Sequence, residues 1–526
     1  MTGITLDLDS KKPLPDVTIR LKRSAKSTRS LADGSFSLQL PPPPHLDTLV
    51  FSRIGYSDLQ VAPNSLAFGK PQHFYLKPRP LALSPVMVTT KKLVEKKFGI
   101  TNHKALLHFT DGTMAPGKPF EIAQVIRLGS AVATLTSVNL YLAASQPDSA
   151  TVTVRFYAFD GDQPTKAEVA KPVVRRVAIE EGWLKLILPK QAIHVQGDVV
   201  VGLEFSPSSN SRYSIPYEIK LGGTTKSFAR NSRETDWRVP PHHYRLYVTA
   251  LVPNSTRASR PDDSENQETA PSARLFSKAV QDSFSVYVQL PKGYAAHKKR
   301  RYPVVLVLDA NAYFDIVRSE TKKLKSARPP ILVGVGYQDA LQMDSLRQRD
   351  YLYPAAPPAD SLPLSGGGMK FLSFFQSELL PYLDHNYRTD ANNRTLMGHS
   401  FGGYFVLYAL AEALQTDTCY FTRYVAASPS LYYGNEYLRR EFTAAHKASA
   451  HPNVQTLYLT MGSQELDGNN AESAATKVAF NSFVGVLSAS QLPALKLQQT
   501  IYPGYTHMET AVPSFIEGLE GLYQQP

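Results

Sequence analysis

The chain has 526 residues, of which 43% are hydrophobic and 19% charged, and a formal net charge of +12. That length exceeds what one hydrophobic core usually organises, and the composition is that of folded protein, so we expect several domains. The basic residues are not interleaved with aromatic residues, which argues against a nucleic-acid partner, and no apolar run approaches the roughly 18 residues of a transmembrane segment.

The cysteine content and the first residues narrow the class further. Cys419 is the single cysteine, which excludes disulfide bonds within the chain and cysteine-rich zinc sites. Residues 1–6 already have the pattern of a strand, and no charged segment followed by an apolar one precedes them. The chain as written therefore shows no signal peptide.

Residues 1–90 have the short alternating runs of an all-β domain, broken by turn signals such as Asp33-Gly34. Four stretches resemble, in order and spacing, the carboxypeptidase regulatory-like domain, a small β-sandwich: Gly3, Lys12 to Val17, Ala32 to Leu38, and Ile54-Gly55-Tyr56. Residues 83–89 resemble the exit strand that follows such domains in Gram-negative cell-envelope proteins. The resemblance implies a spacer or docking module in the periplasm or cell envelope, whereas the missing signal peptide leaves the compartment open.

Residues 91–253 are again rich in strands, for example Val152 to Tyr157 and Asp198 to Phe205, and predict a second, jelly-roll-like β-sandwich. Such sandwiches often bind sugars, so carbohydrate or cell-envelope contact is an expectation by analogy of fold. Gly112 to Lys118 has the spacing of a phosphate-binding loop, but Pro119 stands where the metal-binding hydroxyl and the helix should follow. We therefore do not expect a nucleotide site.

A polar linker, residues 254–273, separates this segment from residues 274–526, where buried strands alternate with amphipathic helices. This alternation predicts a mostly parallel sheet covered on both faces, with an antiparallel edge strand at Phe284 to Val288. The expected core strands are Val304 to Leu308, Ile331 to Val335, Thr395 to Met397, Tyr424 to Ala427, Thr456 to Thr460 and Leu497 to Tyr502. The expected helices are Met369 to Leu383, Gly403 to Leu414, Ala471 to Leu487 and Val512 to Leu522.

The segment Gly398-His399-Ser400-Phe401-Gly402 is a G-x-S-x-G motif between a predicted strand and a predicted helix. In that context the serine lies on a sharp turn that exposes its hydroxyl, and the flanking glycines leave room for the close approach of the backbone. The helix N-terminus then points at the charge that develops on an attacked carbonyl. Ser400 is therefore the predicted nucleophile of an α/β-hydrolase.

A serine nucleophile needs a base, and in this fold the chain order is serine, acid, histidine. His446 and His451 precede the next strand, whereas His507 follows the last one, so His507 is the predicted base. The acid should follow the strand that ends near Met461, where Glu465 and Asp467 are both candidates and Glu465 is preferred. The oxyanion donors should be the amide of Phe401 and that of Ala310 or Asn311, after the strand that ends at Leu308-Asp309.

Residues 275–526 resemble the putative-esterase family that includes esterase D, the ferric-enterobactin esterases and the feruloyl esterases. The matching stretches are Tyr302 to Asp309, Arg347 to Tyr351, Glu378 to Tyr382, Tyr387 to Thr389, Gly398 to Gly403, Ser428 to Ser430 and Pro503 to His507. The family's usual Asp-Gly is Asp309-Ala310 here, so the second oxyanion donor stays open between Ala310 and Asn311. In this family the catalytic acid often lies in a Gly-x-x-Glu segment. Gly462 to Glu465 matches that segment, which favours Glu465 over Asp467 as the acid.

The resemblance implies a serine ester hydrolase that needs no metal and no organic cofactor, and that acts on a bulky or polar ester such as a siderophore lactone or a feruloyl or acetyl sugar ester. Arg347 and Arg349 either meet an anionic part of this small-molecule or glycan-linked substrate or pair with Asp350 to brace their loop. Tyr432 and Tyr433 either line an acyl pocket or belong to the core. Two other functions stay open, namely an inactive scaffold protein and an acyltransferase.

Overall fold

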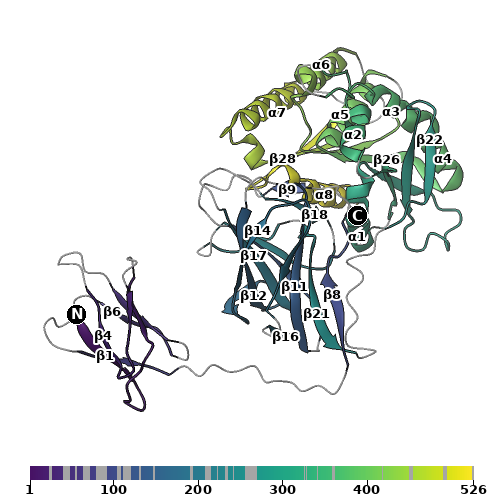
Figure 1. Ribbon diagram of the computed structural model, residues 1–526. Coiled ribbons are helices and arrows are strands. Elements are labelled where there is room, and N and C mark those ends of the chain that lie inside the picture. Colours follow the sequence, from purple (N-terminus) through teal and green to yellow (C-terminus); the bar gives the residue numbers. More distant parts are fainter. Residues whose placement is uncertain are drawn as a thin grey trace. The chain divides into compact units, whose positions relative to one another are not determined.

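The computed structural model describes residues 1–523 except for 23–26, 40–47, 54–55, 63–71, 79–91, 104–107, 111–119, 130–131, 146–148, 190–192, 208–214, 222, 232–234, 241, 255–268, 325, 327, 340–341, 358–361, 417–418, 449–453 and 490–494. The Gly112 to Lys118 motif, the predicted exit strand and most of the predicted linker lie outside the described residues. Within the described part, no helix has the length and apolar character that crossing a bilayer requires. Contacts divide the chain into two compact units, Met1–Val88 and Thr89–Pro526 (Figure 1).

The first unit consists of short strands in two small sheets, with the orders β4-β1-β7 and β3-β2-β5-β6. Phe36, Phe51 and Phe74 pack together in its core, with ring centroids 4.4 to 5.7 Å apart. The strands are β1 Thr2–Asp7, β2 Thr18–Leu21, β3 Ser27–Arg29, β4 Ser35–Ser37, β5 Leu49–Ser52, β6 Leu59–Val61 and β7 Gln72–Leu76.

The second unit begins with two larger sheets. In one sheet the strand order is β13-β12-β17-β10-β19, and β14 also pairs with β12. In the other sheet the order is β20-β18-β11-β21-β8, where β15 and β16 also pair with β11 and β9 pairs with β18. We call this part the β-sandwich. Its strands are β8 Leu93–Gly99, β9 His108–Thr110, β10 Phe120–Ile126, β11 Val132–Leu142, β12 Ser149–Phe159, β13 Pro164–Glu168, β14 Val173–Ala178, β15 Gly182–Ile187, β16 His194–Gln196, β17 Val199–Pro207, β18 Pro216–Lys220, β19 Ser227–Arg230, β20 His243–Tyr244 and β21 Leu246–Pro253.

The rest of the unit is an α/β layer structure around a sheet of eight strands, β22-β23-β25-β24-β26-β27-β28-β29. The strands are β22 Ala273–Ser277, β23 Asp282–Gln289, β24 Tyr302–Val307, β25 Ile331–Tyr337, β26 Thr389–His399, β27 Arg423–Ala427, β28 Gln455–Gly462 and β29 Leu495–Tyr502. The helices are α1 Ala310–Lys323, α2 Met343–Tyr351, α3 Gly368–Phe374, α4 Leu380–Asn386, α5 Phe401–Gln415, α6 Tyr433–Ala448, α7 Ala471–Ala489 and α8 Ala511–Tyr523, and a π-helical turn, Phe375–Leu379, joins α3 to α4.

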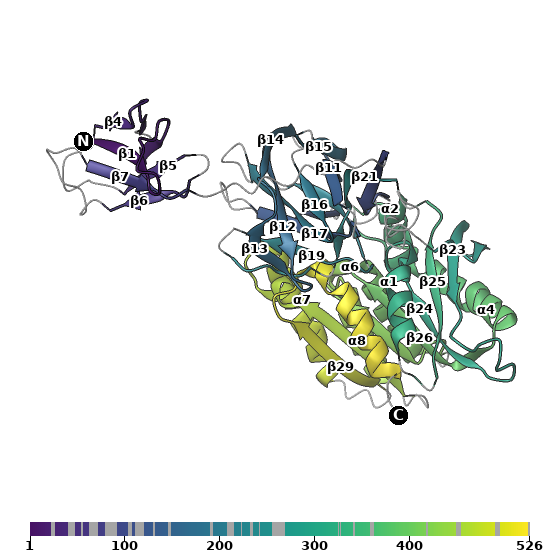
Figure 2. The ribbon, with the colours of Figure 1, turned by 90° about the horizontal axis from the view of Figure 1, so that it is seen from below.

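Each predicted strand and helix of this segment corresponds to an element of the structure, and β23 is antiparallel to β25 as expected. The sequence pattern did not predict α1, α2 or α6. Helices α1 and α8 lie side by side over one face of the sheet (Figure 2). The other helices cover the opposite face, so the central strands are buried on both sides, which explains their continuous apolar sequences.

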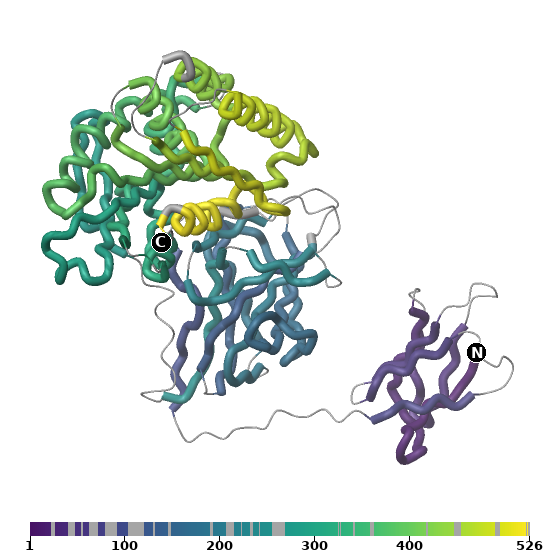
Figure 3. Tube along the Cα trace, turned by 180° about the vertical axis from the view of Figure 1, so that it is seen from behind, coloured from purple at the N-terminus to yellow at the C-terminus, as the bar shows by residue number. Residues whose placement is uncertain are grey.

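The β-sandwich and the α/β layers share one contiguous cluster of buried apolar side chains. Figure 3 shows the C-terminal helix α8 beside the strands of the β-sandwich. The two parts were predicted as separate domains, 91–253 and 274–526, and both lie within the second compact unit.

We expect Leu396→Ala to lower the free energy of unfolding by about 3 kcal/mol, because Leu396 is fully buried in the central strand β26 and its loss leaves a cavity. The control, Leu364→Ala, removes a side chain that is 47% exposed and should change stability by less than about 0.5 kcal/mol. Denaturant titration measures both. Equal effects would contradict this description of the core.

Candidate active site

Ser400 lies in the turn between β26 and α5, with backbone angles φ 61° and ψ −120° that a serine rarely adopts. Its N–H donates to Ala427 O at 3.0 Å, which ties the turn to the neighbouring strand β27. A Cβ atom at Gly398 would lie 2.4 Å from the carbonyl oxygen of Gly402. Glycine is therefore required at position 398 for the chain to turn this sharply.

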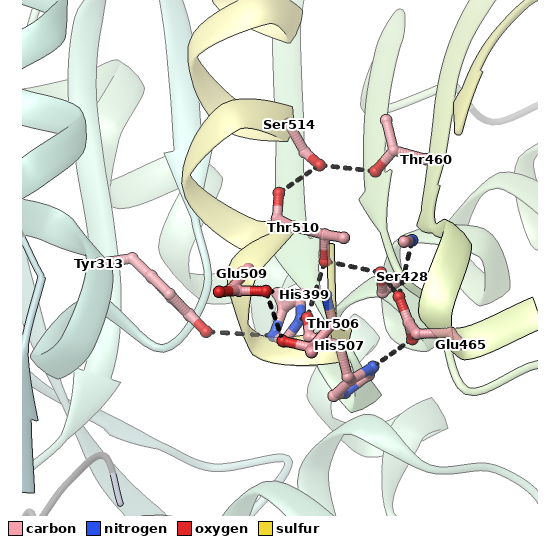
Figure 4. A network of polar contacts seen from close by, with 11 residues as sticks. Tyr313, His399, Ser428, Thr460, Glu465, Thr506, His507, Glu509, Thr510 and Ser514 are labelled. Atoms are coloured by element: carbon pink, nitrogen blue, oxygen red, sulfur yellow. Dashed lines mark hydrogen bonds and ion pairs between the residues drawn. The ribbon is translucent and has the colours of Figure 1, made fainter. Parts of the chain in front are cut away.

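His507 follows β29 and forms a hydrogen bond with Glu465, which follows β28; the distance from Nδ1 to Oε2 is 2.6 Å (Figure 4). The other carboxylate oxygen of Glu465 accepts hydrogen bonds from Ser428 Oγ at 2.6 Å and from the Gly462 N–H at 2.8 Å. The carboxylate is thus held at both oxygens, and it orients the imidazole through Nδ1. His507 itself remains 40% exposed at its side chain.

The charge state of Glu465 follows from two opposing effects. Burial of the side chain favours the neutral acid, but the donors His507, Ser428 and Gly462 outweigh burial and hold the pKa of Glu465 below its ordinary value. An ionised carboxylate only accepts hydrogen bonds, so His507 Nδ1 carries the proton and leaves Nε2 as the free base position. Asp467 instead accepts hydrogen bonds from Asn469, at 2.9 Å from the backbone N–H and 2.7 Å from Nδ2.

His399, the variable residue before Ser400, is buried beneath His507, with ring centroids 4.7 Å apart. Its Nε2 lies 2.8 Å from the carbonyl oxygen of His507, and its Nδ1 lies 3.1 Å from the hydroxyl of Tyr313. A carbonyl oxygen can only accept, so Nε2 donates and the neutral ring accepts from Tyr313. Burial, together with the nearby guanidinium charge of Arg347, lowers the pKa of His399 well below its ordinary value, so this ring stays neutral.

Two helix N-termini supply candidate oxyanion donors. Phe401 is the first residue of α5, and Ala310 is the first residue of α1, after Asp309 in a left-handed conformation with φ 51°. The N–H groups of the first helical turn have no partner within their own helix and can bind an anion. The side chain of Asn311 is engaged elsewhere, because it donates to Tyr337 O at 2.9 Å and accepts from the Tyr337 N–H at 2.7 Å.

The two arginines predicted to bind substrate or brace a loop are both paired with carboxylates. Arg347 is 3.0 Å from Asp309 Oδ2 and also donates to the carbonyl oxygen of His399 at 3.2 Å. Arg349 contacts Asp350 at 2.7 Å and Asp282 at 2.9 Å. Both therefore occupy bracing positions, and Asp309 rather than Asp350 is the partner of Arg347.

Tyr432 and Tyr433 differ in how deeply their side chains are buried. Tyr433 is 2% exposed, donates to the carbonyl oxygen of Pro354 at 2.6 Å and packs edge-on against Tyr404, as a core residue does. Tyr432 is 47% exposed, which leaves it accessible to a ligand. The two tyrosines, for which the sequence suggested the same two roles, therefore differ in burial: Tyr433 belongs to the core and Tyr432 is accessible.

Several polar residues of the site escaped the sequence-based prediction. Ser428, Thr510, Tyr313 and His399 all contact His507 or its partners (Figure 4). His399 and Ser428 lie in motifs that the sequence analysis had recognised. Tyr313 lies in α1 and Thr510 directly before α8, where the sequence analysis singled out no motif. Within the described residues, no group of three or more His, Cys, Asp or Glu side chains is arranged to hold a metal ion.

Comparison with known proteins shows what the C-terminal region is similar to. Residues 277–515 match the family described as "Putative esterase". Ferri-bacillibactin esterase BesA of Bacillus subtilis (strain 168) is 28% identical over 247 residues, which are 39% of this chain and 81% of that protein. The apo-salmochelin esterase of Escherichia coli O6:H1 is 35% identical over 152 residues, which are 27% of this chain and 46% of that protein, so the chain spans about half of its length. Among solved structures, the BES protein from Bacillus cereus is 25% identical, with a TM-score of 0.41 over 49% of this chain and 97% of that one.

The geometry predicts a spectroscopic signature for the pair of His507 and Glu465. A short hydrogen bond from an imidazole N–H to a carboxylate shifts the proton resonance far downfield, so we expect such a signal in the wild-type protein. Glu465→Gln should abolish or strongly shift it, because the charged acceptor is lost. Asp467→Asn is the matched control, since Asp467 contacts Asn469, and it should leave the signal unchanged. The reverse ranking would show that Asp467 is the partner of His507 in solution.

Proposed function

We propose that this protein is a carboxylic ester hydrolase that cleaves its ester through a covalent acyl-enzyme on Ser400, since residues 277–515 match the putative-esterase family and resemble named esterases. The hydrogen bond between His507 and Glu465, beside a serine held in a strand-to-helix turn, is the observation that carries this proposal. It combines an oriented base with a partly exposed serine.

In the first half of the reaction, Ser400 Oγ attacks the ester carbonyl carbon while His507 Nε2 takes the hydroxyl proton. Glu465 stabilises the imidazolium that forms, because its ionised carboxylate already accepts the proton on Nδ1. The negative charge on the carbonyl oxygen meets the amides of Phe401 and of Ala310 or Asn311, which stand at two helix N-termini. The tetrahedral intermediate then expels the alcohol, which leaves with the proton from His507.

The second half repeats these roles with water. His507 Nε2 removes a proton from a water molecule, whose oxygen attacks the acyl carbon, and Ser400 leaves with that proton as the free serine returns. Neither step requires a group other than the residues named and water. If an alcohol replaced water in this half, the same site would transfer the acyl group instead, so product analysis distinguishes the two outcomes.

For the substrate we propose a bulky, polar ester of the siderophore type. The relatives carry the names ferri-bacillibactin esterase, apo-salmochelin esterase and siderophore enterobactin esterase. Tyr432 is 47% exposed and lies two residues after Ser430, whose N–H lies 3.4 Å from the carbonyl oxygen of Ser400, which supports a contact between this tyrosine and the substrate. An aromatic acyl group can pack against such a ring.

Ser400→Ala should lower kcat by about 10⁴-fold, because the attacking oxygen is removed. It should also abolish labelling by a fluorophosphonate, while the melting temperature stays within a few degrees of the wild type. Both are measured on the purified full chain. A variant that retains more than about a tenth of the wild-type turnover would exclude Ser400 as the nucleophile.

The substrate proposal is tested by comparing kcat/KM across catecholate lactones, feruloyl esters, acetyl esters and long-chain acyl esters. We expect the catecholate lactone to be preferred by at least about tenfold over the acetyl ester, a difference near 1.4 kcal/mol in transition-state binding. Preference for acyl chains of about twelve carbons or more would contradict the proposal. A flat profile over the short esters would indicate an esterase without the proposed specificity.

A further inference from the structure

Among the described residues, the side chain of Arg238 connects the β-sandwich to the turn that carries His507. Arg238 follows β19, and two backbone hydrogen bonds fix it there, from the Arg238 N–H to Ala229 O at 2.8 Å and from the Ala229 N–H to Arg238 O at 2.9 Å. The preceding residue, Trp237, packs over the guanidinium of Arg230 at 4.0 Å, and Arg230 is paired with the buried Glu121. The backbone of Arg238 is therefore anchored to β19 through Ala229.

The side chain of Arg238 donates a hydrogen bond from Nη1 to Oε1 of Glu509, across from the β-sandwich to the α/β layers. The Glu509 side chain is only 3% exposed, while that of Arg238 is 47% exposed. A buried carboxylate is costly unless a cation or several donors compensate for its lost hydration. Among the described ion pairs, Arg238 is the cation that meets Glu509.

Glu509 in turn closes the short 3₁₀ turn His507–Glu509. Its second oxygen, Oε2, accepts hydrogen bonds from the N–H and the hydroxyl of Thr506, both at 2.9 Å, and the Glu509 N–H donates back to Thr506 O at 3.2 Å. Figure 4 shows Glu509 and Thr506 on the side of His507 away from Glu465. The residue immediately before the histidine is thus held by the carboxylate that Arg238 neutralises.

We propose that Arg238 is a positioning residue for His507: the β-sandwich holds the histidine turn in place through Arg238, Glu509 and Thr506. The inference rests on the proposed function, in which His507 is the base. The α/β layers fix the ring through Glu465 and the His507 carbonyl through His399 and Thr510. Arg238 adds the restraint on the N-terminal side of the turn, so the non-catalytic half of the unit contributes to the geometry of catalysis.

A positioning role predicts a specific kinetic pattern for Arg238→Ala in the full chain. We expect kcat to fall by about tenfold, because small displacements of a general base are expensive, while KM stays within about twofold. Arg238→Lys restores the charge and should recover kcat to within about threefold of the wild type. Arg127→Ala is the matched control: Arg127 is exposed on the same β-sandwich and donates to Thr224 O within that β-sandwich, so its loss should leave kcat unchanged.

A double-mutant cycle tests whether Arg238 acts through Glu509. Glu509→Gln removes the charge that Arg238 neutralises but keeps an oxygen that accepts from Thr506. If the two residues work as one unit, Arg238→Ala should lower kcat by less than about twofold further in the Glu509→Gln background. Additive losses would contradict the proposed connection.

The downfield proton of His507 provides a readout that does not depend on turnover. Arg238→Ala should broaden or shift that resonance, and Arg127→Ala should not. The proposal is overturned if Arg238→Ala leaves both kcat and the resonance unchanged, or if its loss of activity follows a lowered melting temperature and is not rescued by lysine. If the resonance responds to Arg238→Ala but the wild type hydrolyses no ester, the proposed function fails and the positioning role stands.

Discussion

The hydrogen bond from His507 to Glu465 depends on the close contact of two loops that are far apart in the sequence. The loop after β28 and the loop after β29 are joined by hydrogen bonds from the Gln464 N–H to Tyr505 O at 3.1 Å and from the Gly504 N–H to Ser463 Oγ at 2.8 Å. Gly462 permits this approach, since a Cβ atom there would lie 2.3 Å from the carbonyl oxygen of Tyr505. Adjacent parallel strands deliver both loops to the same edge of the sheet, which is where ligands bind in open α/β folds.

Buried polar groups beneath His507 and Glu465 hold the backbone of His507, while Glu465 holds its ring. The carbonyl oxygen of His507 accepts from His399 and from Thr510, each at 2.8 Å. His399 donates from Nε2, and burial keeps its ring neutral by lowering its pKa. The residue next to the proposed nucleophile is therefore specialised for structure rather than for proton transfer.

Arg347 connects the two turns that present candidate oxyanion donors. Its guanidinium is bound to Asp309, which precedes α1, and to the carbonyl oxygen of His399, which precedes the Ser400 turn. Asp309 is also in contact with the hydroxyl of Tyr351 at 3.1 Å. Removing either ionic partner would leave a buried charge, so this pair constrains the spacing of the two helix N-termini. That constraint applies whether Ala310 or Asn311 supplies the second donor.

Much of the α/β segment could be predicted from the sequence, because its signals are local. Continuous apolar runs marked strands buried on both faces, and the spacing of Gly398, Ser400 and Gly402 between a strand and a helix predicted a turn that the structure contains. The chain order of serine, acid and histidine led to the choice of His507 and Glu465, which the structure brings within 2.6 Å. Helices α1, α2 and α6 were not predicted, although the apolar residues of α1 and α6 gather along one face of each helix.

Only the tertiary structure decided which charged and polar side chains meet. The sequence allowed Arg347 to face a ligand or a neighbouring acid, and packing placed it against Asp309, 38 residues away. The contact between Arg238 and Glu509 spans 271 residues and joins segments that the sequence pattern had separated into different domains. Periodicity and motifs report which face of an element is buried, but the pairing of charges depends on how completed elements pack, and that information is spread over the whole chain.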